Sequence, residues 1–200
     1  MDNDTWLDLF VVNGHVYPQM DQISSGARYR QGKLLFVNNG DGTFCDATRA
    51  GGAILSEQRV SRGAAFGDLD NDGQIDIVVE DLDSSPTILK NEGDRTNHWL
   101  TLELGAKTGN PLAIGARVKI TTEGKVAQIE EVRSGGSYLS QNDLRVHFGL
   151  GKAAKVDSIE IRWNSGKTET IKDVAADKFY SILEGEGIVP FEKIRPKAKK

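Results

Sequence analysis

The chain has 200 residues, a net charge of −4 and 38% hydrophobic residues, values typical of a globular protein with one or two domains. No apolar stretch approaches the roughly 20 residues of a membrane-spanning helix, so a membrane span is excluded. The single cysteine, Cys45, excludes an internal disulfide framework. It alternates with Phe44 in a strand-like run, so we expect it to be a small core residue.

Residues 1–96 are rich in Asp, Asn and Gly, and their apolar runs are short. Helical periodicity over ten or more residues is hard to find, whereas alternating runs that end in turn residues indicate strands. Residues 97–186 alternate more evenly, and most of their runs end in glycine or in an Asn-Ser-Gly turn. We therefore predict an all-β chain whose two halves pack closely, with a boundary near residue 97.

The first half contains an internal repeat. Residues 2–12 (DNDTWLDLFVV) align with residues 70–80 (DNDGQIDIVVE), 68 positions later. Residues 34–41 (LLFVNNGD) resemble residues 87–94 (TILKNEGD) at an offset of 53. A constant core with an insertion of variable length is typical of stacked β units.

Carboxylates crowd the stretch FGDLDNDGQIDIVV, which begins at Phe66. Acidic residues at positions 1, 3 and 5 of a curled loop, followed by a turn at Gly73, resemble the start of an EF-hand loop, but Val79 stands where that loop needs a glutamate. An all-oxygen set with water fits calcium better than magnesium, and no His or Cys is present for zinc or copper. The predicted ligands are the side chains of Asp68, Asp70, Asp72 and Asp76 and the backbone carbonyl of Gln74.

The charge of this loop also favours a cation. Residues 68–83 contain seven acids and no Lys or Arg, and two like charges about 4 Å apart cost about 4 kcal/mol at an effective dielectric of 20. The alternative is a solvated Asx-rich hairpin turn, which explains Asn71 to Gly73 but not the other acids. A truncated second site is predicted at Asp2, Asp4 and Asp8, without a counterpart of Asp68, and we expect it to be empty or weak.

These motifs resemble known families. FGDLDNDGQIDIVV is similar to the FG-GAP/VCBS repeat of integrin-type β-propellers, and LLFVNNGDGTFCDAT to the outer strands of such a blade. IGARV, EVRSGGSYLSQNDLRVHFGLG and VDSIEIRWNSGK match the ASPIC/UnbV domain in order. The whole resembles the C-terminal part of a bacterial homologue of cartilage acidic proteins. The resemblance implies calcium at the aspartates, a partial propeller of about two blades in residues 1–96, and a β-sandwich-like domain in residues 97–186.

Other polar features are less specific. The loop of residues 134–143 (SGGSYLSQND) offers groups suited to a sugar or peptide, or forms only a structured turn. His147 alternates with apolar neighbours, so we expect it to face outward, and Trp6, Trp99 and Trp163 to be packing residues. The basic segment 187–200 is predicted to be a disordered tail, too weak a pattern to indicate nucleic-acid binding.

No catalytic constellation is visible outside the aspartate loops. The primary hypothesis is therefore a non-catalytic, calcium-stabilised module for binding or cell-surface interaction with an unknown protein or glycan ligand. The alternative is a carbohydrate-active enzyme, or its carbohydrate-binding accessory, with catalytic residues in missing N-terminal blades. We expect an extracellular or periplasmic location, with a signal peptide and further propeller blades upstream of Met1.

Overall fold

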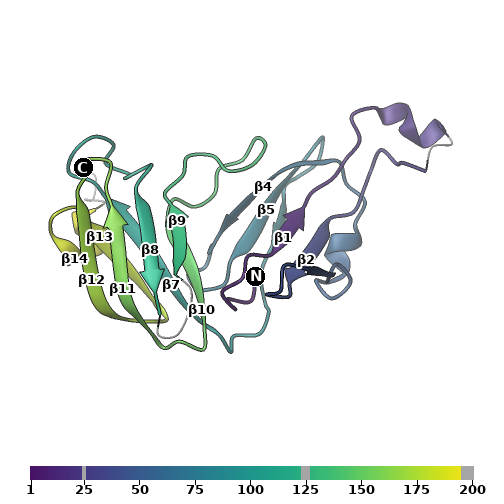
Figure 1. The fold of residues 1–200 in the computed structure, drawn as a ribbon. Helices are drawn as coiled ribbons and strands as arrows, with labels where there is room; N and C mark the ends of the chain where they lie inside the picture. The colour runs from purple at the N-terminus through teal and green to yellow at the C-terminus, as the bar shows by residue number, and fades with distance from the viewer. Residues whose placement is uncertain (24–25, 123–126, 195–200) are drawn as a thin grey trace.

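The computed structural model describes residues 1–23, 26–122 and 127–194, and it is all-β, as predicted (Figure 1). The described residues form four sheets in two groups, and none of these sheets is closed. Figure 1 shows the sheets of the first half on one side, those of the second half on the other, and the N-terminus at the junction between them. In the described part of the chain, no helix is both long and apolar enough to cross a membrane.

The first half consists of two three-stranded antiparallel sheets, in the orders β1-β2-β3 and β4-β5-β6. Each sheet corresponds to one copy of the internal repeat. The elements are β1 (Leu9–Val11), η1 (Pro18–Gln22), β2 (Leu34–Asn38), β3 (Phe44–Asp46), η2 (Ala53–Ser56), β4 (Ser61–Gly67), β5 (Asp76–Asp81) and β6 (Thr87–Leu89).

The second half contains two four-stranded sheets, in the orders β10-β7-β13-β14 and β12-β11-β8-β9. Most pairs are antiparallel, but β7 and β13 run parallel. The elements are β7 (His98–Gly105), β8 (Arg117–Thr121), β9 (Gln128–Glu131), β10 (Val146–Gly151), β11 (Lys155–Arg162), β12 (Thr168–Ala175), β13 (Lys178–Leu183), β14 (Gly187–Val189) and η3 (Phe191–Lys193).

The large hydrophobic core lies in the second half. Alternate residues of the facing strands point inward, as period-two patterning requires. Leu102, Phe148, Ile159 and Trp163 are among the residues at most 2% exposed in this core. The first half has a much smaller buried apolar cluster, centred on Ile77, so its sheets depend more on polar contacts.

The loop of residues 134–143 joins the two halves. The backbone N–H of Asp143 donates to the carbonyl of Phe66 at 2.9 Å, and the N–H of Phe66 donates to Asn142 Oδ1 at 3.1 Å. A Cβ on Gly63 would lie 2.8 Å from the carbonyl oxygen of Tyr138. The loop is thus a structured segment that covers part of β4, which is the edge strand of its sheet.

Several sequence-based expectations are wrong. Cys45 is exposed rather than in the core, because β3 is a short edge strand whose residues are all exposed. Trp6 is 51% exposed, whereas Trp163 is buried as expected. The predicted disordered tail begins too early: Gly187–Val189 pairs with β13 and Phe191–Lys193 forms a 3-10 turn, while residues 195–200 lie outside the described residues.

Candidate metal site

The β4–β5 hairpin brings three of the predicted carboxylates together. Asp68 follows β4 directly and Asp76 opens β5, where it pairs with Gly67 across the hairpin. Asp68, Asp70 and Asp76 each offer an oxygen within 4.8 Å of the others. The tight loop between them contains Asn71 at φ +60° and Gly73 at φ +86°, conformations that asparagine and glycine tolerate best.

Backbone amides hold two of these carboxylates in place. Asp68 accepts hydrogen bonds from the N–H groups of Asp72 and Gly73, at 3.0 and 2.8 Å. Asp76 accepts from Leu69 at 3.0 Å and from Asn91 at 2.8 Å. Burial raises the pKa of Asp68, although both amide bonds oppose that rise. A cation beside this carboxylate would restore its preference for the ionised form.

The other two predicted ligands lie differently. Asp72 accepts the N–H of Gln74 at 2.9 Å and pairs with Arg95, so it is not in the group of three. Gln74 is 2% exposed, and its side-chain Oε1 is buried without a hydrogen-bond partner among the described residues. The assignment of all five residues as ligands therefore stays a prediction.

Cations from distant segments reach the loop, which corrects the view that its acids are uncompensated. Lys90 Nζ lies 2.5 Å from Asp70 Oδ2, and this contact lowers the pKa of Asp70 and raises that of Lys90. Arg95 pairs with Asp72. Arg145 donates to the backbone carbonyl of Asp68 at 2.8 Å. The sequence count of residues 68–83 missed these groups because all three lie outside that segment.

The donor set still fits calcium. Three carboxylates meet at one end of a hairpin, the cluster contains only oxygen donors, and the nearby Gln74 has an unpaired buried oxygen. Calcium takes six to eight oxygen ligands, and water completes sets of this kind. Lys90 occupies one face of Asp70, so a metal would compete with this ammonium for the same carboxylate.

The first aspartate loop (residues 2–8) repeats the hydrogen bonds of the second aspartate loop (residues 68–76). At the offset of 68, the Trp6 N–H donates to Asp4 as that of Gln74 does to Asp72, at 2.8 and 2.9 Å. At the offset of 53, the Asn38 N–H donates to Asp8 as that of Asn91 does to Asp76, at 2.9 and 2.8 Å. The repeat is therefore structural.

The first loop nevertheless differs as a site. Thr5 stands where the second loop has Gly73, and it adopts φ +91°, an unfavourable value for a β-branched residue. The nitrogen of Met1 bonds to Asp8, as the N–H of Leu69 does to Asp76. Within the described residues, Asp2, Asp4 and Asp8 do not form a metal-like group.

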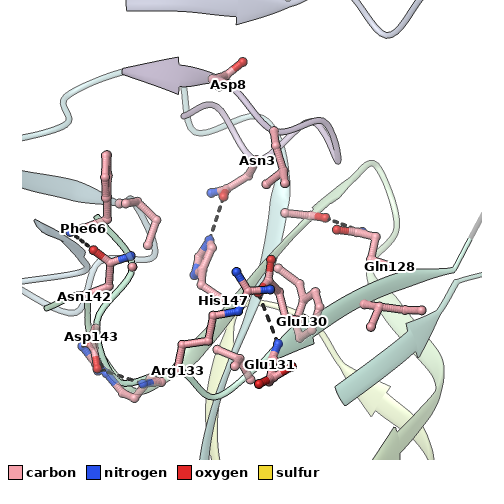
Figure 2. Close-up of a pocket in the computed structure, with 18 of the residues that line it drawn as sticks. Asn3, Asp8, Phe66, Gln128, Glu130, Glu131, Arg133, Asn142, Asp143 and His147 are labelled. Carbon is pink, nitrogen blue, oxygen red and sulfur yellow. Dashed lines mark hydrogen bonds and ion pairs between the residues drawn. The ribbon is translucent and has the colours of Figure 1, made fainter. Parts of the chain in front are cut away.

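A cleft of about 510 Å³ is lined by residues of the first aspartate loop and of the second half (Figure 2). Figure 2 shows Asn3 directed from one side toward His147 on the other, with Glu130, Glu131 and Arg133 nearby. His147 does not face bulk solvent as predicted: its Nε2 lies 2.8 Å from Asn3 Oδ1 and its Nδ1 2.8 Å from Thr101 Oγ1. Burial lowers its pKa to about 4, so it is neutral at pH 7.

Sequence reasoning missed the residues that link the halves. His147 and Arg145 were not expected near the aspartate loops, because the contacts that they make are 144 and 74 positions apart in the chain. Their only sequence signal is position: they are two residues apart at the start of a strand, and therefore project on the same side.

Comparison with known protein families agrees with this architecture. Residues 1–79 match the FG-GAP-like repeat model, and residues 106–189 match the ASPIC and UnbV model. The first half is thus similar to FG-GAP-like repeats and has the form of a partial propeller, and the second half is similar to ASPIC/UnbV domains, which agrees with the resemblance found in the sequence.

Among curated proteins, the chain is similar to cartilage acidic protein 1. It is 28% identical to the Xenopus tropicalis protein over 189 residues, which are 92% of this chain and 27% of that protein. It is 27% identical to the human protein over 186 residues, 92% of this chain and 26% of that protein. The chain therefore spans about a quarter of the length of these relatives.

Proposed function

We propose that this chain is a calcium-stabilised, non-catalytic interaction module of an extracellular or periplasmic protein. The observation that carries the proposal is the convergence of Asp68, Asp70 and Asp76 at the mouth of the β4–β5 hairpin. The metal would bind to these carboxylates and, with water, to the segment around Asp72 and Gln74. Its charge would compensate the carboxylates and tie the two strands of the hairpin together.

The interaction role is supported by the two matched families and by the similarity to cartilage acidic protein 1. The partner would be a protein or a glycan, bound with the help of further propeller blades in the parent protein. In the described cleft, Asp143 pairs with Arg145, and Asp8 pairs with the N-terminal ammonium group of Met1. Such pairing favours a binding or structural role over acid–base catalysis.

Thermal unfolding tests the metal. Calcium at 100 times its Kd would add about 2.7 kcal/mol, which raises the Tm of a chain of this size by about 5–10 °C. Asp70 is exposed and its side chain pairs with Lys90 alone among the described residues, so Asp70→Asn removes a ligand with little effect on the fold. The variant should lose most of the calcium-dependent shift.

The matched control is Asp173→Asn. Asp173 is an exposed, lysine-paired aspartate of the second half at φ +55°, a conformation that asparagine accepts. This variant should keep the full calcium shift, and magnesium at equal concentration should give a smaller shift in every protein. An equal calcium shift in Asp70→Asn and in the wild-type chain would refute the site.

A further inference from the structure

The second half contacts equivalent asparagines in the two aspartate loops. Asn3 and Asn71 occupy the same place in the repeat, and both have φ +60°. Arg145 Nη1 donates to Asn71 Oδ1 at 2.7 Å, and His147 Nε2 lies 2.8 Å from Asn3 Oδ1 (Figure 2). Arg145 directly precedes β10 and His147 is the second residue of that strand, so one side of this segment contacts both loops.

The direction of the His147 bond follows from its neighbours. The Asn3 amide nitrogen donates to the carbonyl of Gly73 at 2.9 Å, which leaves Oδ1 as the acceptor toward His147. The neutral ring then donates from Nε2 and accepts the hydroxyl of Thr101 at Nδ1. Asn3 therefore connects β10 to both aspartate loops.

Two contacts within the second half hold the guanidinium of Arg145 in place. Its Nε donates to Asp143 Oδ2 at 2.7 Å, and its Cζ lies 5.1 Å from the centre of the Phe179 ring. Its remaining nitrogens bind Asn71 and the carbonyl of Asp68. A guanidinium held in this way loses little entropy when it binds, so it can hold the loop in one conformation.

Close packing adds to these bonds. A Cβ on Gly73 would lie 2.1 Å from ring atoms of Trp99, and a Cβ on Gly149 would lie 2.6 Å from Asn3 Cα. The second half thus contacts the turn of each loop directly. A change in the conformation of either loop must change this interface as well.

We infer that β10 of the ASPIC/UnbV domain recognises the aspartate loops, and that Arg145 is a positioning residue for calcium binding at the loop of residues 68–76. This inference rests on the proposed function. Arg145 binds the Asp68 carbonyl and Asn71, and so holds the loop that presents the carboxylates. Because linkage is reciprocal, calcium in the loop would in turn strengthen the docking of the second half.

Calcium titration of the full chain separates positioning from charge. Arg145→Gln removes a positive charge near an acidic loop, so electrostatics alone would tighten calcium binding. If Arg145 positions the loop, its loss should instead weaken calcium binding. We expect the Kd to rise by at least about fivefold, which is the lower end of typical coupling between sites. Arg133→Gln is the control, because it makes the same charge change and the Arg133 side chain has no hydrogen bond or ion pair among the described residues. Its Kd should stay within about twofold.

A second variant tests the same contact in case Arg145→Gln does not fold. Asn71→Gly removes the acceptor of Arg145, keeps the guanidinium, and allows the positive φ. Its Kd should also rise, and the double variant with Arg145→Gln should bind no more weakly than the weaker single variant. Hydrogen exchange gives the reciprocal readout: calcium should slow exchange of the Asp143 amide in the wild-type chain but not in Arg145→Gln.

The outcomes distinguish the two proposals. An unchanged or lower Kd in both Arg145→Gln and Asn71→Gly, with normal binding by the wild-type chain, would refute the positioning role and leave the calcium site intact. No heat of binding in the wild-type chain would refute the proposed function and, with it, the coupling. Weaker binding in both variants, with the control unchanged, would support the inference.

Discussion

The contact between Gly149 and Asn3 provides the sharpest test of the interface between the halves. A Cβ at Gly149 would lie 2.6, 2.7 and 2.8 Å from the Cα, the carbonyl carbon and the oxygen of Asn3. These are backbone atoms, which cannot move aside as a flexible side chain can. Overpacking of this kind lowers the free energy of unfolding by about 1–3 kcal/mol. Replacing glycine by alanine in a strand raises it by about 0.5–1 kcal/mol, because the unfolded chain has less freedom.

We therefore expect Gly149→Ala to destabilise the docked chain by about 1–2 kcal/mol, or roughly 2–8 °C in Tm. The local reporter is the Gly151 amide, which donates to the Asn3 carbonyl at 2.8 Å and should exchange faster in the variant. Asn3 is not among the residues of the large core of the second half, so amides in β11 should keep their protection.

Gly105→Ala is the matched control in the same sheet. The three atoms nearest to its Cβ would be side-chain carbons of Ile194 and Leu183, at 3.2–3.3 Å, and these can shift. It should leave the Gly151 amide unchanged. Wild-type protection of Gly151 in Gly149→Ala would show that the first loop does not dock on β10, and would overturn the reasoning.

Four further predictions follow from individual contacts. Thr5→Gly removes the strain of a positive φ, which is worth about 1–2 kcal/mol. The glycine also raises the entropy of the unfolded chain, which costs about 0.5–1 kcal/mol of stability, so urea unfolding should show a small net gain in stability. Lys90→Met frees Asp70 and should lower the calcium Kd in calorimetry; a higher value would mean that Lys90 supports the site. The same titration of the wild-type chain should give one calcium per chain, and a value near two would mean that the first loop also binds. Two lysines lower the pKa of Glu186 from 4.5 to about 2. The contribution of Glu186 to folding stability is therefore complete above pH 4.5 and is lost as the pH falls toward 2. In Glu186→Gln, urea midpoints should therefore fall less over this range than in the wild-type chain, and parallel curves would argue against these ion pairs.

The local parts of the site could be predicted from sequence. The spacing of Asp68, Asp70 and Asp76 around Gly73 required a tight turn between two strands, and the structure has that hairpin. The repeat offsets placed Asp8 and Asp76 in equivalent positions, and their amide bonds recur. These features depend on residues close in the chain, where spacing and turn chemistry determine the geometry.

The long-range parts could not be predicted. Lys90, Arg95 and Arg145 approach the loop only because the sheets pack in a particular order, which the pattern of any one segment does not contain. The exposure of Cys45 could not be predicted for the same reason. Its alternation correctly indicated a strand, but whether β3 is an edge strand or a covered one depends on its neighbours in space.

The parallel pairing of β7 with β13 has a mechanical consequence. These strands lie near the two ends of the second half and pair through six residue positions, from Lys178 with Leu100 to Leu183 with Gly105. A pulling force applied at the two ends of the domain would load all of these hydrogen bonds in shear at the same time, whereas a hairpin would open one bond after another. We therefore expect the second half to resist tension applied between its two ends, and single-molecule pulling should register this as one high-force rupture rather than a gradual extension.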